Sequence, residues 1–388
     1  MKLLLYAFFA TLPLYYTSDF RVYLYGVSIT INLIIIFILG IIILISTHKI
    51  KISKLKRVFI VLLLLFTLYH TFLYNDVVDS SLYFKYIIKI YLGFFIFFIT
   101  YIMSAKYLTK NNIDYYLKIF IFSSSVLLSM YIFIYYYVLH TPFLGILIDN
   151  PELTTAGKNQ AQLYMALSFP VVLYLFSKYK NIFTIYAFIV HIIAVLYIGS
   201  RGLWVSLIFS GLIYFLVTLK KYKIYIRSIF KYIASLVLFL AVLFQFSNIH
   251  LQTEHFSEAI DAYNKLISLY ENDGDVSTDS SATEREEFIR IGINNLSKNI
   301  FFGNGLGYFL TVNPYKKVTH NDYIFFLSDM GLIGFFLYLS ILFLSLYLLK
   351  ELKFLVVPFY LDLLFINAYN VAFFWILLGI YLGMKKRI

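Results

Sequence analysis

The sequence predicts an all-α polytopic membrane protein with about twelve transmembrane helices, and three observations support this fold class. Hydrophobic residues make up 61% of the 388 positions and charged residues only 13%, against about 25% charged residues in soluble domains. Apolar runs of about 20 residues, the length that crosses a bilayer as a helix, recur along the chain. Lysine and arginine gather in alternate connections between these runs, as they do in oriented membrane proteins.

Twelve apolar runs are expected to cross the membrane, and they divide the chain into three parts. Residues 1–246 contain nine spans, residues 247–319 form one large outer loop with short helices, and residues 320–388 contain three spans. The first run follows Lys2 and is short enough for a signal peptide, but no small-residue cleavage site follows it. The expected spans are 3–16, 22–46, 57–74, 82–103, 115–139, 160–177, 182–199, 203–219, 229–246, 320–349, 354–369 and 370–384.

The distribution of basic residues sets the orientation of these spans. With the amino terminus inside, the inner loops and ends hold 21 of the 32 lysines and arginines, whereas the short outer loops hold Arg21, Lys158 and Arg201. Cytoplasmic loops carry such an excess, so both termini are expected in the cytoplasm and residues 247–319 outside. The net charge of +12 is then a topology signal and an attraction for anionic lipids, and no nucleic-acid partner is expected.

A helix is predicted in the outer loop, where Thr283 and Glu286 form a capping box for a run that ends at Lys298. At about 100° per residue, Arg285 lies on an apolar face that is expected to be buried against the membrane spans. Arg290 lies toward the polar side of the same helix. The apolar face consists of Phe288, Ile289, Gly292, Ile293 and Leu296.

Two outer arginines are candidates for binding an anion. Because an unpaired buried charge is costly, Arg285 needs an anionic partner, either on a substrate or on a neighbouring carboxylate such as Glu286 or Asp261. Arg201 occupies a short turn between two spans. It is either a bidentate ligand for phosphate or carboxylate or an interfacial residue that extends to the lipid headgroups.

Polar residues also open two of the spans on the outer side. Lys158 and Asn159 precede the sixth span, and His320 and Asn321 begin the tenth. A histidine with a pKa near neutrality can accept a proton from a sugar hydroxyl. The alternatives are a structural histidine and a lysine that anchors the span at the interface. We expect Lys158, Asn159 and Asn321 to contact the substrate around His320.

Lys85 and Lys89 lie one helical turn apart near the outer end of the fourth span. Charged residues within a span are candidates for function, so we expect both lysines, together with Arg290, to bind the substrate. The alternative is that the lysines form ion pairs with Asp329 or Asp362 inside the membrane.

The candidates chosen for their chemistry share one compartment. By the predicted topology Lys158, Arg201, Arg285 and His320 all lie on the outer face, where they form a basic site with one general base. The absence of cysteine excludes a thiolate nucleophile and a cysteine-based metal site, and no cluster of histidines and carboxylates accompanies the four residues. The sequence therefore predicts a site for a diphosphate-bearing lipid, without a metal or other cofactor.

Three ordered motifs make the prediction more specific. The segments are IGSRGLWVSL, TEREEFIRIGINNLSKNIFFGNGLGYF and THNDYIFFLSDMGLIGFFLYL, and the stretch that carries them is roughly residues 199–339. Their order resembles the O-antigen ligase and polymerase family of bacterial inner membranes. Arg201, Arg285 and His320 fall on the family's positions one by one. Ile289 departs from the pattern, because the family usually has an aromatic residue there.

The resemblance implies a GT-C-like glycosyltransferase of the bacterial inner membrane that acts on the periplasmic side without a nucleotide sugar. In ligases of the family, a glycan passes from undecaprenyl diphosphate to the lipid A-core, whereas polymerases pass it to another lipid-linked repeat unit. Arg201 and Arg285 would neutralise the leaving diphosphate, and His320 would take the proton of the acceptor hydroxyl in one inverting displacement. The short chain and the match around His320 favour the ligase.

A transporter or flippase for the lipid-linked glycan is the alternative from another class of protein. Such a protein is expected to have broken helices, internal repeats and polar residues near the middle of the membrane. Here the spans are largely apolar and the polar candidates gather at one face, which favours an enzyme.

Overall fold

The structure of the 388-residue chain is a computed structural model. The residues that it describes are 2–13, 21–24, 27–45, 52–73, 76–109, 112–133, 154–198, 200, 202–211, 280–315, 317, 319, 321–364 and 372–384. The expected span at 229–246 and residues 247–279 of the outer loop therefore lie outside the described residues.

Helices dominate the described residues, together with one β-hairpin. The elements are α1 (Lys2–Thr11), β1 (Arg21–Leu24), β2 (Val27–Thr30), α2 (Ile31–Ile45), α3 (Lys54–Thr71), α4 (Ser80–Tyr107), α5 (Ile113–Phe133), α6 (Thr154–Tyr179), α7 (Ile182–Ile198), the helix Gly202–Gly211, α11 (Ser280–Lys298), α12 (Tyr308–Val312), α13 (Asp322–Leu349), the 3-10 helix η7 (Lys350–Leu355), α14 (Val357–Asp362) and α15 (Ala372–Gly383).

Within the described residues, three helices are long and apolar enough to cross a membrane: α4, α5 over Ile113–Met130, and α13. This agrees with the predicted helical membrane protein. The number of twelve spans and the GT-C-like arrangement remain predictions.

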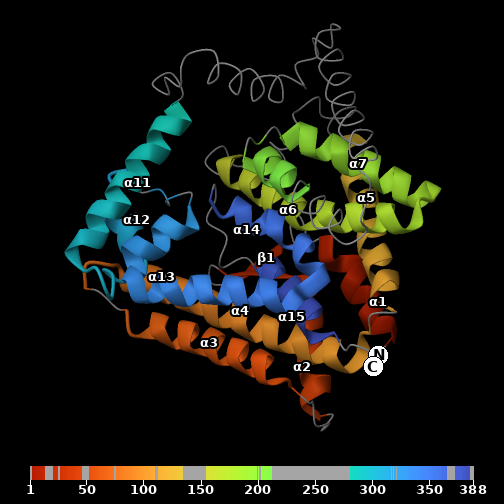
Figure 1. The fold of residues 1–388 in the computed structure, drawn as a ribbon, viewed down its shortest axis with the longest axis horizontal. Helices are drawn as coiled ribbons and strands as arrows, with labels where there is room; N and C mark the ends of the chain where they lie inside the picture. The colour runs from red at the N-terminus through yellow and green to blue at the C-terminus, as the bar shows by residue number, and fades with distance from the viewer. Residues whose placement is uncertain are drawn as a thin grey trace, which may run out of the picture.

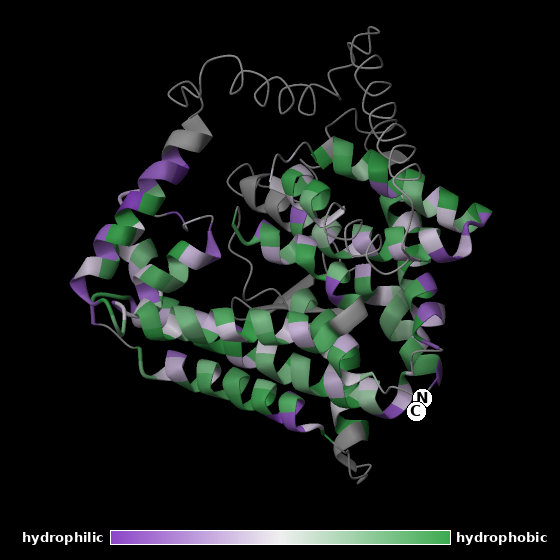
Figure 2. Cartoon of the chain, viewed as in Figure 1, coloured by the Kyte–Doolittle hydropathy of each residue, from purple (hydrophilic) through white to green (hydrophobic). Residues whose placement is uncertain are grey.

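The packing of the helices forms two groups (Figure 1). On one side, α3 packs against both α4 and α13, and α15 lies along α4. On the other side, α7 packs against α5 and α6, and α1 packs against α5. The contact of α14 with α6 joins the groups, and α11 and α12 lie at the end of α13. In Figure 2, hydrophilic residues gather on α11, whereas α3, α4 and α13 are mostly hydrophobic.

Small residues allow α4 and α15 to approach closely. A methyl group at Gly93 would lie 2.8 Å from Trp375, and one at Gly379 would lie 2.7 Å from the carbonyl oxygen of Phe97. Ser104 donates a hydrogen bond to the Ile380 carbonyl at 2.6 Å. Without a hydrophobic driving force between helices in lipid, such small and hydroxyl-bearing residues supply the packing.

Three of the expected spans begin or continue differently in the structure. The span expected at 22–46 begins with the hairpin, in which Arg21 pairs with Thr30, because this segment is rich in β-branched and aromatic residues around a glycine. The span expected at 354–369 is divided between η7 and α14, and Pro358 stands in the first turn of α14, where its fixed φ favours a new helix start. The span expected at 320–349 is broken at Gly331.

Candidate active site

The break in α13 is filled by the glycine-rich turn that follows α11. Gly331 has φ 63° and ψ −167°, and Gly303 in the turn has φ 77°. A methyl group at Gly303 would lie 2.4 Å from the Gly331 nitrogen, and one at Gly331 would lie 2.4 Å from the Gly303 nitrogen. Only glycine permits two backbones at positive φ to come this close.

Hydrogen bonds from the turn replace those that the helix loses at the break. Leu332 N donates to the Ile300 carbonyl at 2.9 Å, and Ile333 N donates to the Phe301 carbonyl at 3.1 Å. In the opposite direction, Gly305 N donates to the Asp329 carbonyl at 2.9 Å. Irregular backbone at membrane depth is tolerated where protein satisfies its polar groups. We call the break at Gly331 and the turn that packs into it the docking joint. It differs from the broken helices of a transporter, whose backbone groups line a cavity.

The Asp329 carboxylate completes this joint. Its two oxygens accept hydrogen bonds from Gly307 N at 2.8 Å and Phe309 N at 2.9 Å, at the start of α12. A carboxylate at this position satisfies free amide groups of a helix start. Asp329 thus holds the outer loop on α13.

The loop helix α11 buries a different face from the one predicted. Phe288, Gly292 and Asn295 are buried, whereas Ile289 and Ile293 are 39% and 53% exposed. The prediction that both isoleucines face the membrane spans is therefore wrong. Because a methyl group at Gly292 would lie 2.3 Å from Ile324 of α13, the small glycine, rather than the bulky isoleucines, sets the closest contact.

The two ends of α11 were predicted with different success. The helix ends at Lys298 as expected, but it begins at Ser280, so the capping box expected from Thr283 to Glu286 is wrong. Both residues lie inside the helix.

The two arginines of α11 differ in environment. Arg285 is partly buried, and its charge acts on the Asp362 carboxyl group of α14. Arg290 is 74% exposed in its side chain and approaches Glu287 at 3.9 Å. Of the carboxylate partners considered for Arg285, Asp261 lies outside the described residues.

The segment between α12 and α13 is tied to α11 by its polar side chains. Tyr315 donates a hydrogen bond to Glu287 at 2.6 Å, and Lys317 forms an ion pair with Glu284 at 3.1 Å. The hydrogen bond to Glu287 raises the pKa of Tyr315. These contacts hold the chain that leads to residue 320 beside the part of α11 that carries Arg285.

Asn321 fixes the start of α13. Its Oδ1 accepts a hydrogen bond from Ile324 N at 3.1 Å, which is an N-cap, and its Nδ2 donates to the Leu364 carbonyl at 3.1 Å. Asp322 N donates to the Leu363 carbonyl at 3.0 Å. His320 itself lies outside the described residues, but the residue after it is joined to the end of α14.

Lys158 and Asn159 lie in the second turn of α6, and the structure describes their backbone alone. Arg201 lies outside the described residues. Its neighbours Ser200 and Gly202 are buried, the first beside α6 and the second at the start of the following helix.

A cluster of four buried polar residues, Gln162, Ser200, Ser206 and Asp362, links these elements, and we name it the polar cluster. Ser200 donates to Gln162 Oε1 at 2.5 Å, and Gln162 Nε2 donates to Asp362 Oδ1. Ser206 donates to the same oxygen at 3.4 Å. The cluster brings together α6, Ser200, the helix Gly202–Gly211 and α14.

Lys85 and Lys89 form no ion pair with a carboxylate of the described residues. Their expected partner Asp329 is bonded to backbone amides, and Asp362 is bonded within the polar cluster. The ion-pair interpretation of the two lysines is therefore wrong for both carboxylates. Their side chains lie on exposed positions of α4, and their predicted contact with a substrate remains a prediction.

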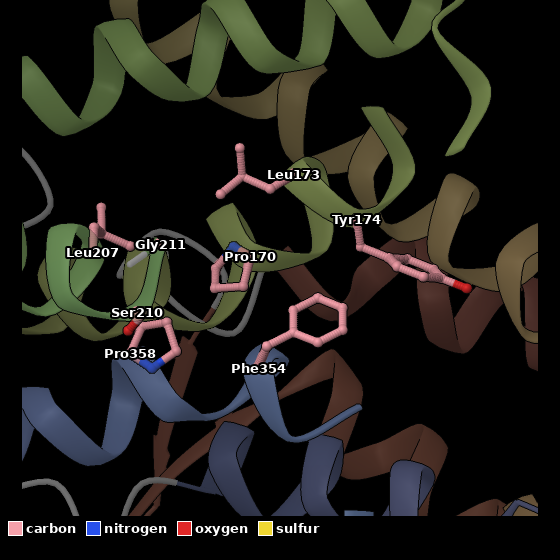
Figure 3. Close-up of a pocket in the computed structure, with 8 residues that line it drawn as sticks. All are labelled: Pro170, Leu173, Tyr174, Leu207, Ser210, Gly211, Phe354 and Pro358. Atoms are coloured by element: carbon pink, nitrogen blue, oxygen red, sulfur yellow. The ribbon is translucent and has the colours of Figure 1, made fainter. Parts of the chain in front are cut away.

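A small apolar cavity lies along the same three helices as the polar cluster (Figure 3). Its volume is about 30 Å³, which is close to the share of one water molecule. The lining residues are Pro170, Leu173, Tyr174, Leu207, Ser210, Gly211, Phe354 and Pro358. The cavity is too small for a sugar and holds no charged side chain, so it is not a reaction site.

In the described residues, no group of three or more histidines and carboxylates is placed to bind a metal ion. The described neighbours of the candidate residues meet near the end of α14: Ser200 is linked through Gln162 to Asp362, and Asn321 is bonded to Leu364. The charge of Arg285 also acts on Asp362. Asp362 is the residue that sequence reasoning missed in this role. The signal available was an aspartate within an otherwise apolar span.

The described residues form a helical fold with three helices that are long and apolar enough to cross a membrane. The model of the O-antigen ligase (Wzy_C) family matches residues 186–339. This match agrees with the predicted resemblance and covers the part of the chain that contains Arg201, Arg285 and His320. It supports a role of the ligase or polymerase type in lipopolysaccharide biosynthesis. A search of curated proteins finds no match to the chain.

Proposed function

We propose that this protein is an O-antigen ligase, which transfers a polysaccharide from undecaprenyl diphosphate to the lipid A-core oligosaccharide. The observation that carries the proposal is the convergence on α14 of the elements that bear Arg201, Arg285 and His320. We place the reaction at the periplasmic face of the bacterial inner membrane, with both termini in the cytoplasm, because of the distribution of basic residues.

The proposed reaction is a single displacement at the anomeric carbon of the donor. The acceptor hydroxyl oxygen forms the new glycosidic bond while the bond from the anomeric carbon to the diphosphate oxygen breaks, which inverts the configuration. His320 accepts the hydroxyl proton as general base. Arg201 and Arg285 stabilise the charge that develops on the departing undecaprenyl diphosphate.

The described contacts support this assignment of roles. Asn321 caps α13 and anchors its start to Leu364, which supports a base that is next in sequence to a fixed helix start. Arg285 lies partly buried on α11, which is clamped to α13 at Gly292. Catalytic groups on rigid elements keep the geometry that a displacement requires. Arg290, exposed on the outer side of α11, is suited to contact the glycan rather than the diphosphate.

Polymerisation is the second candidate function, because the family match covers both activities. Lipopolysaccharide from a deletion strain separates the alternatives on a silver-stained gel. A ligase deletion gives core without polymer while lipid-linked polymer accumulates. Core that carries one repeat unit indicates a polymerase. Unprocessed repeat units confined to the inner leaflet indicate a flippase and would overturn the enzyme proposal.

A further inference from the structure

Four large apolar side chains are exposed where the glycine-rich turn meets the end of α3, and we name them the apolar tip. Three of them are consecutive, since Ile300, Phe301 and Phe302 are 48%, 63% and 57% exposed. The fourth, Phe72, directly follows α3 and is 82% exposed. Tyr69, in the last turn of α3, donates a hydrogen bond to the Phe302 carbonyl and so joins the two parts. Contiguous exposed apolar side chains mark a surface that binds a partner or a membrane.

The backbone of the turn is paired within the protein although its side chains are exposed. The carbonyl oxygens of Ile300, Phe301 and Phe302 each accept a hydrogen bond. Their donors, in the same order, are Leu332 N at 2.9 Å, Ile333 N at 3.1 Å and the Tyr69 hydroxyl at 3.1 Å. Water would satisfy the carbonyls of an ordinary surface loop, whereas hydrocarbon requires that protein does so. Exposed apolar side chains on a backbone with paired carbonyls are the combination that a lipid environment requires.

The apolar tip also lies at the depth where the hydrocarbon of a bilayer would begin. The part of α13 after the break, residues 331–349, is about 28 Å long as a helix, close to the hydrocarbon thickness of roughly 30 Å. The turn is bonded to residues 332 and 333, at the beginning of this length. In Figure 1, α3 and α13 run side by side toward α11 and α12. The predicted topology places this end of α13 on the outer side.

The surroundings of the apolar tip change from apolar to polar in the direction that a membrane interface requires. On α13, Ile333 and Phe336 are exposed and continue the apolar surface into the span. On the other side of the tip, α11 ends at Lys298, which is exposed. A lysine near the end of a helix extends to the headgroups. The tip therefore stands between the apolar surface of α13 and the first charged residue of α11.

We propose that the apolar tip is inserted into the outer leaflet of the bilayer and anchors the end of α11 in the membrane. Aromatic and aliphatic side chains on a polar segment anchor it in this way. The sequence places these three loop residues in the outer loop, so the inference moves part of that loop into lipid. It does not depend on the reaction proposed above. Lipid is the occupant that fits, because the tip continues the exposed apolar surface of a helix long enough to span the membrane.

The test uses the absence of cysteine from the chain, which allows one nitroxide label to be attached without any other substitution. Phe301→Cys and Phe302→Cys are labelled separately in the full-length protein and reconstituted into liposomes of phosphatidylethanolamine and phosphatidylglycerol. Oxygen concentrates in hydrocarbon, whereas a charge-neutral nickel chelate stays mainly in water. The ratio of label collisions with oxygen to those with the chelate therefore reports depth. We expect a ratio several-fold higher at both positions than at a position in water.

Two further labelled positions supply the references. Phe336→Cys, on the exposed side of α13, gives the ratio for hydrocarbon, and Asn294→Cys, on the exposed side of α11, gives the ratio for water. Labels at Phe301 and Phe302 that match Asn294 would show that the tip lies in water and would overturn the inference. Low collision rates with both reagents, together with dipolar broadening between labels, would show that a second copy of the chain covers the tip. That result would overturn the inference as well.

A second measurement uses the wild-type chain and is independent of how the labelled variants fold. Phosphatidylglycerol with a diazirine on one acyl chain is included in the same liposomes and activated by light, and the adducts are located by mass spectrometry. We expect acyl-chain adducts on residues 300–302 as well as on the exposed side of α13. Adducts on α13 alone would show that the protein is inserted while the tip is not in lipid, and would contradict the inference.

Discussion

Replacing Gly303 with alanine is expected to detach the glycine-rich turn from the break in α13. The added methyl group would lie 2.4 Å from the Asp329 carbonyl oxygen and 2.4 Å from the Gly331 nitrogen. Both neighbours are backbone atoms, so no side-chain rotation relieves the overlap. The turn must move away, and the hydrogen bonds from Leu332, Ile333 and Gly305 across the joint are lost or stretched.

The expected loss of stability follows from these contacts. An L-residue at φ 77° costs roughly 1–2 kcal/mol. Each of the three hydrogen bonds contributes about 1 kcal/mol. Together they give a loss of about 4–5 kcal/mol, which is a large part of the stability of a typical protein.

The free energy of unfolding in detergent micelles, measured by denaturant titration, tests this value. Gly211→Ala is the matched control, because a methyl group at Gly211 meets no atom within 4 Å and alanine favours a helix. It should leave stability unchanged or raise it slightly. A Gly303→Ala variant as stable as wild type would show that the turn and the break in α13 separate without cost, and would refute the docking joint.

Three further predictions concern the reaction and the topology. Arg285→Ala should abolish transfer, while Arg290→Ala keeps much of it; equal loss for both α11 variants at normal expression would contradict the assignment. Arg201→Lys should be impaired, because an ammonium group lacks the bidentate fork of a guanidinium. His320→Ala should lower turnover in vitro by about 10²–10⁴-fold and retain binding of the lipid diphosphate, whereas near-normal turnover would exclude a general base there. Reporter fusions within residues 271–281 should show a periplasmic location, and a cytoplasmic signal would separate the site from its acceptor.

The sequence predicted the parts of the site that depend on helical period and on ordered motifs. The end of α11 at Lys298 and the inward position of Arg285 follow from the spacing of apolar residues. The same pattern could not show that Ile289 and Ile293 lie outward. In a membrane protein, apolar residues face lipid as readily as they face protein, so hydrophobicity alone does not choose the buried side.

The contacts that the sequence could not predict are long-range. A glycine in an apolar run lowers the helix propensity at that position but does not by itself predict a break. The break at Gly331 depends on its backbone contact with the turn at Gly303. Asp362 was considered as a partner of the lysines of α4, since sequence distance does not show that Gln162 and Ser200 lie beside it. Backbone contacts between distant segments and buried polar clusters depend on tertiary structure. The periodicity of hydrophobic residues along the chain does not show which distant segments will meet.

The docking joint also has a consequence for how the chain is made. The turn with Gly303 and Gly305 leaves the ribosome before Gly331 and the rest of α13, so its backbone partners do not yet exist when it emerges. We therefore expect the docking joint to form only after α13 has been made, rather than as an independent folding event. A nascent chain that stops before residue 322 should expose the loop to proteases, and extension through residue 349 should protect it.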